Sequence, residues 1–327
     1  MRYLRPLMQV GPALPRDAVA LGWCWFTHVE VLSRTAPAQV IPAKDLTPEE
    51  LTRFGDPGTA PQLMGILNTT PDSFSDGGSF DTLERAVTQG RALVAAGADI
   101  LDVGGESTRP GASLVPEDVE ISRTAPVIAA LRGAGVDVAI SIDTRKAAVA
   151  KAALDAGASI VNDVSGFTFD ADLAPLCVAR GVPVCVMHAQ GEPQSMQKNP
   201  QYNNVLLDVF DALHERVEAL IASGIPREKI TADPGIGFGK TQDHNLAILN
   251  RISLFHGLGV PILLGASRKR FIGSIGNALN AQDRTPGSVA VALAAIAQGV
   301  AIIRAHDVAE HAQAIALWRA SVAHPFA

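Results

Sequence analysis

The amino-acid sequence predicts an α/β protein whose strands and helices alternate and close into a (β/α)8 TIM barrel with an N-terminal extension. Seven times along the chain, a helix-like stretch ends in glycine and a short apolar run follows it. One more apolar run precedes these seven units, which brings the expected strands to eight. An open doubly wound sheet is the alternative, but no GxGxxG fingerprint follows the first strand. Eight strands alternating with helices therefore favour the closed barrel.

The expected strands are short and apolar throughout. The first is expected at 63–67, and the other seven at 100–103, 138–143, 160–163, 184–188, 230–233, 262–265 and 301–304. Each of the seven follows a glycine, the residue that most easily takes the left-handed conformation at a helix end. The runs do not alternate with polar residues, which is typical of parallel strands buried on both faces. Amphipathic helices are expected between them, the clearest at 82–96, 117–132, 146–156 and 205–222.

Residues 1–60 do not follow this repeat. They contain the run Thr47-Pro48-Glu49-Glu50, which reads as a helix N-cap followed by proline at the first helical position and glutamate at the third. We expect residues 1–60 to form an extension packed on the barrel, and residues 61–327 to form the catalytic barrel domain.

Composition and charge limit the classes of function. The net charge of −6 disfavours general binding to nucleic acid, although a local group of cations can still hold a small anion. The three cysteines cannot all pair within one chain and form no CxxC motif, which indicates reduced thiols. No apolar run reaches the roughly 18 residues that span a membrane, and Pro6, Pro12 and Pro15 interrupt any signal sequence. We expect a cytoplasmic protein that binds neither membrane nor nucleic acid.

Polar residues follow the expected strands at the end where barrel enzymes carry their chemistry. In chain order they are Asn68, Asp102, Asp143, Asn162 with Asp163, His188, Asp233, Ser267 with Arg268 and Lys269, and Arg304 with His306. A single Asp or Asn in such a place is often only a turn residue. Eight strands that all end in this way predict one shared polar site at the mouth of the barrel.

The residues at this mouth fall into two chemical groups. Asp143, Asn162 and Asp233 are hydrogen-bonding groups that suit the amino and lactam edges of a planar heterocycle. The cationic group consists of Lys269, Arg304 and His306, with Arg109 and Arg268 nearby, and suits a phosphate or pyrophosphate. Both groups in one site indicate a heterocycle that carries a phosphate ester.

Two βα loops are rich in Gly, Pro, Ser and Thr and are expected to cover the mouth. The first spans 68–78 and carries Phe74, and the second spans 104–111 and carries Arg109. A third segment, 235–241, resembles a phosphate-binding P-loop. The P-loop pattern needs glycine at position 234, where Pro234 stands, so we do not expect a nucleotide site there.

Two long motifs identify a family. The run LMGILNTTPDSFSDGG at 63–78 and the run DVGGESTRPG at 102–111 resemble the two long signatures of dihydropteroate synthases. Shorter runs continue the resemblance over about residues 62–320; they are 141–144, 162–166, 186–188, 233–240, 267–269 and 304–307. The resemblance implies a Mg²⁺-dependent transferase of folate biosynthesis, a pterin-binding TIM barrel that is a target of sulfonamides and forms a homodimer through its last helices. Its substrates would be 6-hydroxymethyl-7,8-dihydropterin pyrophosphate and p-aminobenzoate, and its products 7,8-dihydropteroate and pyrophosphate.

The resemblance also implies roles for individual residues. The pterin would be bound by Asp102, Asp143, Asn162, Met187, Asp233, Phe238, Lys269 and Arg304. The pyrophosphate would be bound by Asn68, Arg109, Arg304 and His306, with Asn68 also a ligand of Mg²⁺. The p-aminobenzoate would be bound by Phe74, Thr108, Arg109, Pro110, Lys269 and Arg270. The residues closest to the chemistry would be Lys269, Arg304, His306 and Asp143.

The chain departs from the family pattern at two positions. Arg270 stands where serine is frequent, which preserves a backbone contact to the benzoate carboxylate but removes a hydroxyl contact. Ile236 stands where phenylalanine is frequent, which changes only packing.

Three alternatives stay open. A methyltetrahydrofolate methyltransferase-like barrel would share the heterocycle pocket without the pyrophosphate group or the two loop signatures. A non-catalytic pterin-binding paralogue would keep the whole site, and a purely structural barrel would have no use for a polar mouth.

Overall fold

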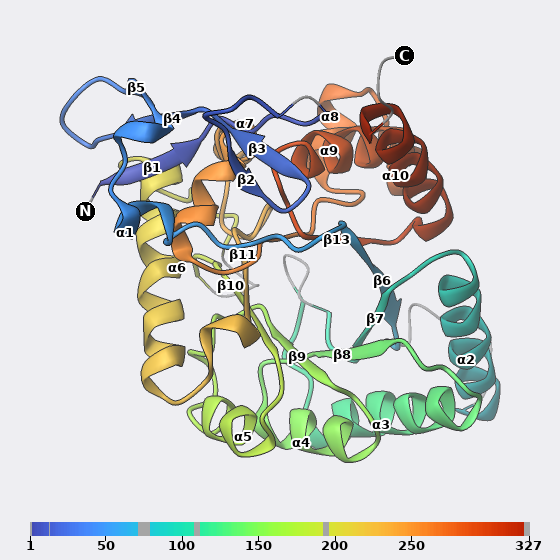
Figure 1. Ribbon diagram of the computed structural model, residues 1–327. Helices are drawn as coiled ribbons and strands as arrows, with labels where there is room; N and C mark the ends of the chain where they lie inside the picture. Colours follow the sequence, from blue (N-terminus) through green and yellow to red (C-terminus); the bar gives the residue numbers. More distant parts are fainter. Residues whose placement is uncertain (1, 13, 71–78, 108–111, 192–195, 324–327) are drawn as a thin grey trace.

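The computed structural model describes residues 2–12, 14–70, 79–107, 112–191 and 196–323, and it confirms the predicted barrel (Figure 1). Eight parallel strands form one sheet in the order β11-β10-β9-β8-β7-β6-β13-β12. They are β6 (Gln62–Asn68), β7 (Ile100–Gly104), β8 (Ala139–Asp143), β9 (Ile160–Asp163), β10 (Val184–Met187), β11 (Ile230–Asp233), β12 (Leu263–Leu264) and β13 (Ile302–Ala305). The sheet closes because Ala232 on β11 pairs in parallel with Ile262, directly before β12.

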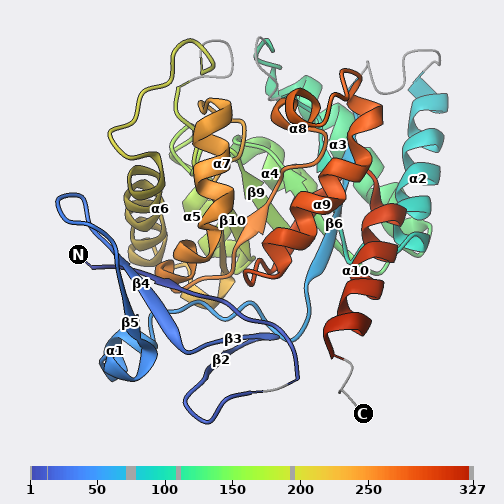
Figure 2. The same ribbon diagram turned by 90° about the horizontal axis from the view of Figure 1, so that it is seen from above.

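Helices surround the strands on the outside of the barrel (Figures 1 and 2). They are α2 (Ser79–Ala95), α3 (Glu117–Gly133), α4 (Ala147–Asp155), α5 (Leu173–Arg180), α6 (Val205–Ala222), α7 (Gln242–Asn250), α8 (Arg270–Ile275), α9 (Thr285–Ile296) and α10 (Val308–Ala323). Short 3-10 helices lie at Arg227–Lys229, Ile252–Leu258 and Ala281–Arg284. The seven predicted glycines all have positive φ, and Gly181 and Gly259 are left-handed caps directly after α5 and the Ile252–Leu258 turn.

The register of the strands brings the predicted polar ends together. Gly104 at the end of β7 lies opposite both Asn68 and Asp143, and Asp143 lies opposite Asn162. Met187 at the end of β10 lies opposite Asp233. Since all eight strands are parallel, these residues share the carboxyl-terminal rim of the barrel. The opposite half of the interior is filled by apolar side chains, namely Met64, Ile100, Cys185, Leu263, Ala301 and Ile302.

Residues before β6 form two small antiparallel sheets. One contains β1 (Tyr3–Pro6), β4 (His28–Leu32) and β5 (Gln39–Pro42), and the other contains β2 (Val19–Leu21) and β3 (Cys24–Phe26). A 3-10 turn (Ala43–Asp45) and α1 (Pro48–Leu51) follow, and Thr47 makes both bonds of the predicted capping box. Figure 2 shows this region at the end of the barrel opposite the carboxyl rim.

The N-terminal region contacts the barrel through polar and aromatic groups. The rings of Tyr3 and Phe210 pack edge to face with centroids 5.7 Å apart. Arg34 bridges Asp208 and Asp211 on α6, with both N–O distances at 2.6 Å. The boundary between residues 60 and 61 stays a prediction.

Two further expectations concern cysteines and membranes. Cys24, Cys177 and Cys185 are buried and carry free thiols. Within the described ranges, every helix is too short or too polar to cross a membrane.

Candidate active site

Arg304, on β13, crosses the mouth of the barrel and holds two carboxylates from other strands. Its Nε donates to Oδ2 of Asp102 at 2.6 Å, and its Nη2 donates to Oδ2 of Asp143 at 2.8 Å. Asp102 lies on β7 and Asp143 ends β8, so one guanidinium joins three strands. Burial lowers the pKa of Arg304, but the two carboxylates outweigh it and raise that pKa above its usual value. The three side chains therefore form an ion-paired group at the floor of the mouth.

The carboxylate of Asp102 has one oxygen that no described residue uses. Its Oδ2 accepts from Arg304 and, at 3.3 Å, from Nδ2 of Asn162. Its Oδ1 is shielded from solvent and has no hydrogen-bond partner among the described residues. A buried acceptor without a donor is costly, so this atom indicates a place where a ligand donates.

Asp143 is poised to change its charge near neutral pH. Burial raises the pKa of Asp143 to about 7; Arg304 opposes this rise, and Asp102 adds to it. Because Arg304 and Asp102 lie next to Asp143, a change in the protonation of Asp143 changes the charge balance of the site. A proton on Asp143 would weaken its pairing with Arg304.

Asp233, at the end of β11, provides a third buried carboxylate. Its Oδ1 accepts from the backbone N–H of Gly235 at 2.7 Å. Burial raises the pKa of Asp233, while the bond from Gly235 and the charge of Lys269 lower it. A Cβ atom on Gly265 would lie 3.7 Å from Asp233 Oδ2 and 3.9 Å from Cδ of Arg304. The glycine thus leaves open the space between this carboxylate and the aliphatic part of the Arg304 side chain.

The loop after β11 is pinned by a buried lysine. Nζ of Lys240 lies 2.9 Å from Nδ1 of His188, and it donates to the backbone oxygens of Gly235 at 2.9 Å and Phe238 at 3.1 Å. A Cβ on Gly235, which has φ +69°, would lie 1.9 Å from the backbone oxygen of His188, so only glycine fits there. Lys240 therefore binds its own loop rather than a nucleotide, which agrees with the rejection of a P-loop.

Sequence reasoning missed the positioning role of Lys240, although a signal was present. A lysine that closes a run of three alternating glycines has many free carbonyl groups within reach. The same loop carries Phe238, whose ring lies 4.1 Å from Nζ of Lys269. The cation–π contact places Lys269 beside the pocket, next to the predicted pterin residue Phe238.

The cationic residues at the rim have different hydrogen-bond and ion-pair partners. His306 Nδ1 lies 3.1 Å from Oγ of Ser267, which also accepts from the His306 backbone N–H at 3.2 Å. Arg268, expected near the anion site, instead makes a two-bond ion pair with Asp307, one bond at 3.0 Å. We therefore correct the interpretation of Arg268, which holds the loop after β12 in place.

Two other residues of the polar rim have defined surroundings. Asp163 accepts from the backbone N–H groups of Ser165 and Phe167, both at 2.7 Å, so it shapes the turn after β9. Asn68 lies beside Asp143: a Cβ on Gly104 would be 3.9 Å from Asn68 Oδ1 and 3.7 Å from Asp143 Oδ2. Glycine at 104 thus leaves room between an amide oxygen and a carboxylate oxygen.

The structure brings together most of the predicted site residues. Asn68, Asp102, Asp143, Asn162, Met187, Asp233, Phe238, Lys269, Arg304 and His306 all lie at the carboxyl rim, and Arg270 begins α8 beside Lys269. Four predicted residues, Phe74, Thr108, Arg109 and Pro110, lie outside the described residues. No group of three or more His, Cys, Asp or Glu side chains in the described ranges could hold a metal ion by itself.

Comparisons with known proteins point in the same direction. Residues 64–306 match the family model described as "Pterin binding enzyme". The dihydropteroate synthase of Synechocystis is 44% identical over 268 residues, which are 81% of this chain and 92% of that protein. A probable bifunctional folylpolyglutamate synthase/dihydropteroate synthase of Haloferax volcanii is 48% identical over 258 residues, but this chain spans only 30% of its length.

Solved structures agree with these relatives. The Xanthomonas albilineans dihydropteroate synthase with 4-aminobenzoic acid superimposes with a TM-score of 0.77 and 41% identity, covering 81% of this chain and 94% of that one. The same enzyme in complex with 7,8-dihydropteroate gives a TM-score of 0.74 at 39% identity and covers 81% and 95% of the two chains.

Proposed function

This chain belongs to the dihydropteroate synthase family of pterin-binding enzymes, and on that premise we propose that it carries out the family's reaction in full. It is a transferase of folate biosynthesis. It would join the methylene carbon of 6-hydroxymethyl-7,8-dihydropterin pyrophosphate to the amino nitrogen of p-aminobenzoate, giving 7,8-dihydropteroate and pyrophosphate. Nothing is carried over from the folylpolyglutamate synthase part of the bifunctional relative, which this chain does not span.

One observation carries the proposal for the pterin. The floor of the mouth is an Arg304–Asp102–Asp143 ion-pair group in which Asp102 Oδ1 is buried and has no partner among the described residues. A pterin has N–H groups along one edge, and such a donor would satisfy this oxygen. Asp233 would accept from the amino-pyrimidinone edge, and the Arg304 guanidinium would lie against the ring face.

The pyrophosphate would lie beside the cations of the rim. Arg304, Lys269 and His306 would stabilise the negative charge that develops as the C–O bond to the pyrophosphate breaks. The oxygen atoms of Asn68 and Asp143 on either side of Gly104 suit Mg²⁺, which prefers a few protein oxygens together with substrate phosphates. When bound there, Mg²⁺ would neutralise part of the charge on the leaving group.

The benzoate site rests on the family resemblance for most of its residues. Thr108, Arg109, Pro110 and Phe74 lie outside the described residues, whereas Lys269 and Arg270 begin α8 next to the pocket. The amine of p-aminobenzoate is a neutral nucleophile, so the protein would mainly orient it and needs no strong base. The C–O electrons leave on pyrophosphate, the amine nitrogen bonds to the methylene carbon, and the nitrogen then releases one proton.

The family resemblance also leads us to propose a homodimer in the cytoplasm. Large apolar side chains are exposed around the last helices, including Ile275 on α8, Leu279 after it and Leu317 on α10. A symmetric contact between two copies would cover them. Analytical ultracentrifugation would give twice the chain mass if this is right.

A coupled assay for pyrophosphate release tests the proposed reaction. Purified protein receives both substrates and Mg²⁺, and each substrate is also supplied alone. We expect pyrophosphate and dihydropteroate in equal amounts, and only when both substrates are present. A pterin-binding paralogue would bind the pterin without releasing pyrophosphate, and a methyltransferase-like barrel would gain no thermal stability from p-aminobenzoate with pyrophosphate.

A substitution at Asp233 tests the pterin role separately. Asp233→Ala should weaken pterin affinity by at least about 1–3 kcal/mol in calorimetry, because the edge donors would lose their acceptor. Asp211→Ala, which removes an exposed carboxylate on α6, is the control. An unchanged pterin affinity in Asp233→Ala would refute this assignment.

A further inference from the structure

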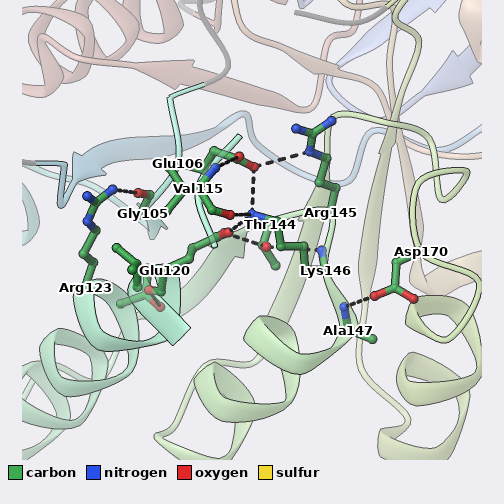
Figure 3. Close-up of polar contacts among 12 residues, drawn as sticks. Gly105, Glu106, Val115, Glu120, Arg123, Thr144, Arg145, Lys146, Ala147 and Asp170 are labelled. Atoms are coloured by element: carbon green, nitrogen blue, oxygen red, sulfur yellow. Dashed lines mark hydrogen bonds and ion pairs between the residues drawn. The ribbon is translucent and has the colours of Figure 1, made fainter. Parts of the chain in front are cut away.

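A buried group of charged and polar side chains lies between the end of β7 and the helices α3 and α4 (Figure 3). We call it the stem cluster, and its members are Glu106, Glu120, Thr144, Arg145 and Lys146. All five are less than a tenth exposed. Such charges are retained in a protein interior only when each is paired and hydrogen-bonded, so the cluster has a geometry that its contacts fix.

Lys146 is the centre of the stem cluster. Its Nζ lies 2.5 Å from Oε2 of Glu120 on α3 and 3.2 Å from Oε2 of Glu106. The same nitrogen donates to the backbone oxygen of Val115 at 2.7 Å. Figure 3 shows these three acceptors converging on the lysine. One ammonium group thus joins a helix to both ends of the segment between Glu106 and Val115.

Glu106 ties the same two ends from the other side. Its Oε1 accepts from the backbone N–H of Val115 at 2.8 Å, and its Oε2 accepts from Nε of Arg145 at 3.3 Å. The guanidinium of Arg145 also lies 4.1 Å from the ring of Phe169. Both backbone groups of Val115 are therefore bound by the stem cluster, its N–H by Glu106 and its carbonyl by Lys146.

The stem cluster is also continuous with the pterin pocket. Thr144, Arg145 and Lys146 directly follow Asp143, the carboxylate that pairs with Arg304. Oγ1 of Thr144 donates to Glu120 at 2.7 Å, so α3 is fixed to the end of β8. The two carboxylates and two cations of the cluster balance in charge, which favours their burial.

We propose that Glu106, Lys146 and Glu120 are positioning residues that hold the two ends of the segment from Glu106 to Val115, and that binding of p-aminobenzoate depends on them. Their charged groups bind one another and also Val115, Thr144 and Arg145. The proposal rests on the proposed function, because Thr108, Arg109 and Pro110 lie in this segment and take their benzoate-binding role from the family resemblance. The proposal predicts that a substitution in the stem cluster raises KM for p-aminobenzoate much more than KM for the pterin pyrophosphate.

Glu106→Gln is the main test. A glutamine has one oxygen, which can satisfy either the N–H of Val115 or the cations, but not both. We expect KM for p-aminobenzoate to rise about tenfold, with KM for the pterin pyrophosphate changed by less than about twofold. Amide hydrogen exchange in residues 112–115 should quicken about tenfold, and this readout needs no turnover.

Glu30→Gln is a matched control. Glu30 is also a buried carboxylate with two cationic partners, Arg5 at 2.7 Å and Arg251 at 3.3 Å, but it lies in the N-terminal region. Glu30→Gln should leave both KM values and the amide exchange of residues 112–115 unchanged. Should Glu106→Gln fail to fold, Arg145→Gln removes one partner of Glu106, leaves Lys146 in place and carries the same test.

The outcomes separate the inference from the proposed function. If wild-type protein makes no dihydropteroate, the proposed function fails and the benzoate part of the inference fails with it, while exchange still reports whether the loop ends are held. If wild-type protein is active, equal changes in both KM values, or unchanged exchange in Glu106→Gln, would overturn the inference. A similar effect in Glu30→Gln would reduce it to a general loss of stability.

Discussion

Two buried lysines hold segments after β7 and β11, which lie on opposite sides of the barrel, and the two lysines have different kinds of partner. Lys146, under the loop after β7, is bound by two carboxylates, with Glu120 at 2.5 Å and Glu106 at 3.2 Å. Lys240, in the loop after β11, is bound by backbone oxygens and the ring of His188. Among the described residues, no carboxylate forms an ion pair with Lys240. Both side chains are at most 3% exposed, so the difference lies in the partners and not in burial.

The partners of each lysine determine whether its buried positive charge has a nearby negative charge. Burial lowers the pKa of Lys240 to about 7; the charge of Asp233 opposes this, and that of Lys269 adds to it. Burial and the nearby Lys240 lower the pKa of His188 to about 3, so the imidazole is neutral at physiological pH. The carbonyl groups around Lys240 thus fix a loop without a counter-charge, whereas the two carboxylates around Lys146 fix a loop and also provide counter-charges. Substitutions of the two lysines should therefore differ in size and in pH dependence.

Lys146→Met should have the larger effect on stability. It would leave Glu106 and Glu120 buried with their main cation removed, and breaking such a pair costs about 3–5 kcal/mol. Urea denaturation at neutral pH would measure the free energy of unfolding. Lys151→Met, which breaks an exposed ion pair with Asp155 on α4, should change that free energy by less than about 1 kcal/mol. A loss in Lys146→Met no greater than in this control would contradict the role of the carboxylate pair.

Lys240→Met should have a smaller effect, of about 1–3 kcal/mol in the same measurement. It leaves carbonyl groups without their donor, but it also removes a charge that burial disfavours. Because the loop carries Phe238 and follows Asp233, pterin affinity should fall together with stability. If Lys240→Met proved more destabilising than Lys146→Met, the comparison between the two lysines would be wrong.

The sequence predicted the barrel because the signal for it is local. Each strand is buried on both faces, so it appears as an apolar run, and the glycine before it marks the end of a helix. The short antiparallel strands of the N-terminal region, such as β2 and β3 with three residues each, carry no such pattern and were not predicted.

The positions of the site residues were predictable, but their pairings were not. Register places Asp102, Asp143 and Arg304 at one rim, and strand ends are visible in sequence. Arg304 can bind both aspartates because the closed barrel brings their strands within reach of its side chain. The spacing of residues along the chain does not predict that distance. The same holds for Arg268, whose pairing with Asp307 removes it from the expected anion site, and for the partners of Lys146 and Lys240.

The pH dependence of stability should report the buried charge of Lys240. The pKa of Lys240 in the folded protein, about 7, lies below the value of about 10.4 in an unfolded chain. Between these values the unfolded chain binds the extra proton, so this group makes the folded state more stable as pH rises, and it is most unfavourable below pH 7. The slope is at most about 1.4 kcal/mol per pH unit.

Subtracting the unfolding free energy of Lys240→Met from that of wild type at pH 7, 8 and 9 isolates this contribution of Lys240, since the tyrosines and cysteines are common to both proteins. A difference that stays flat, or falls with rising pH, would show that the backbone carbonyl groups hold Lys240 charged throughout this range.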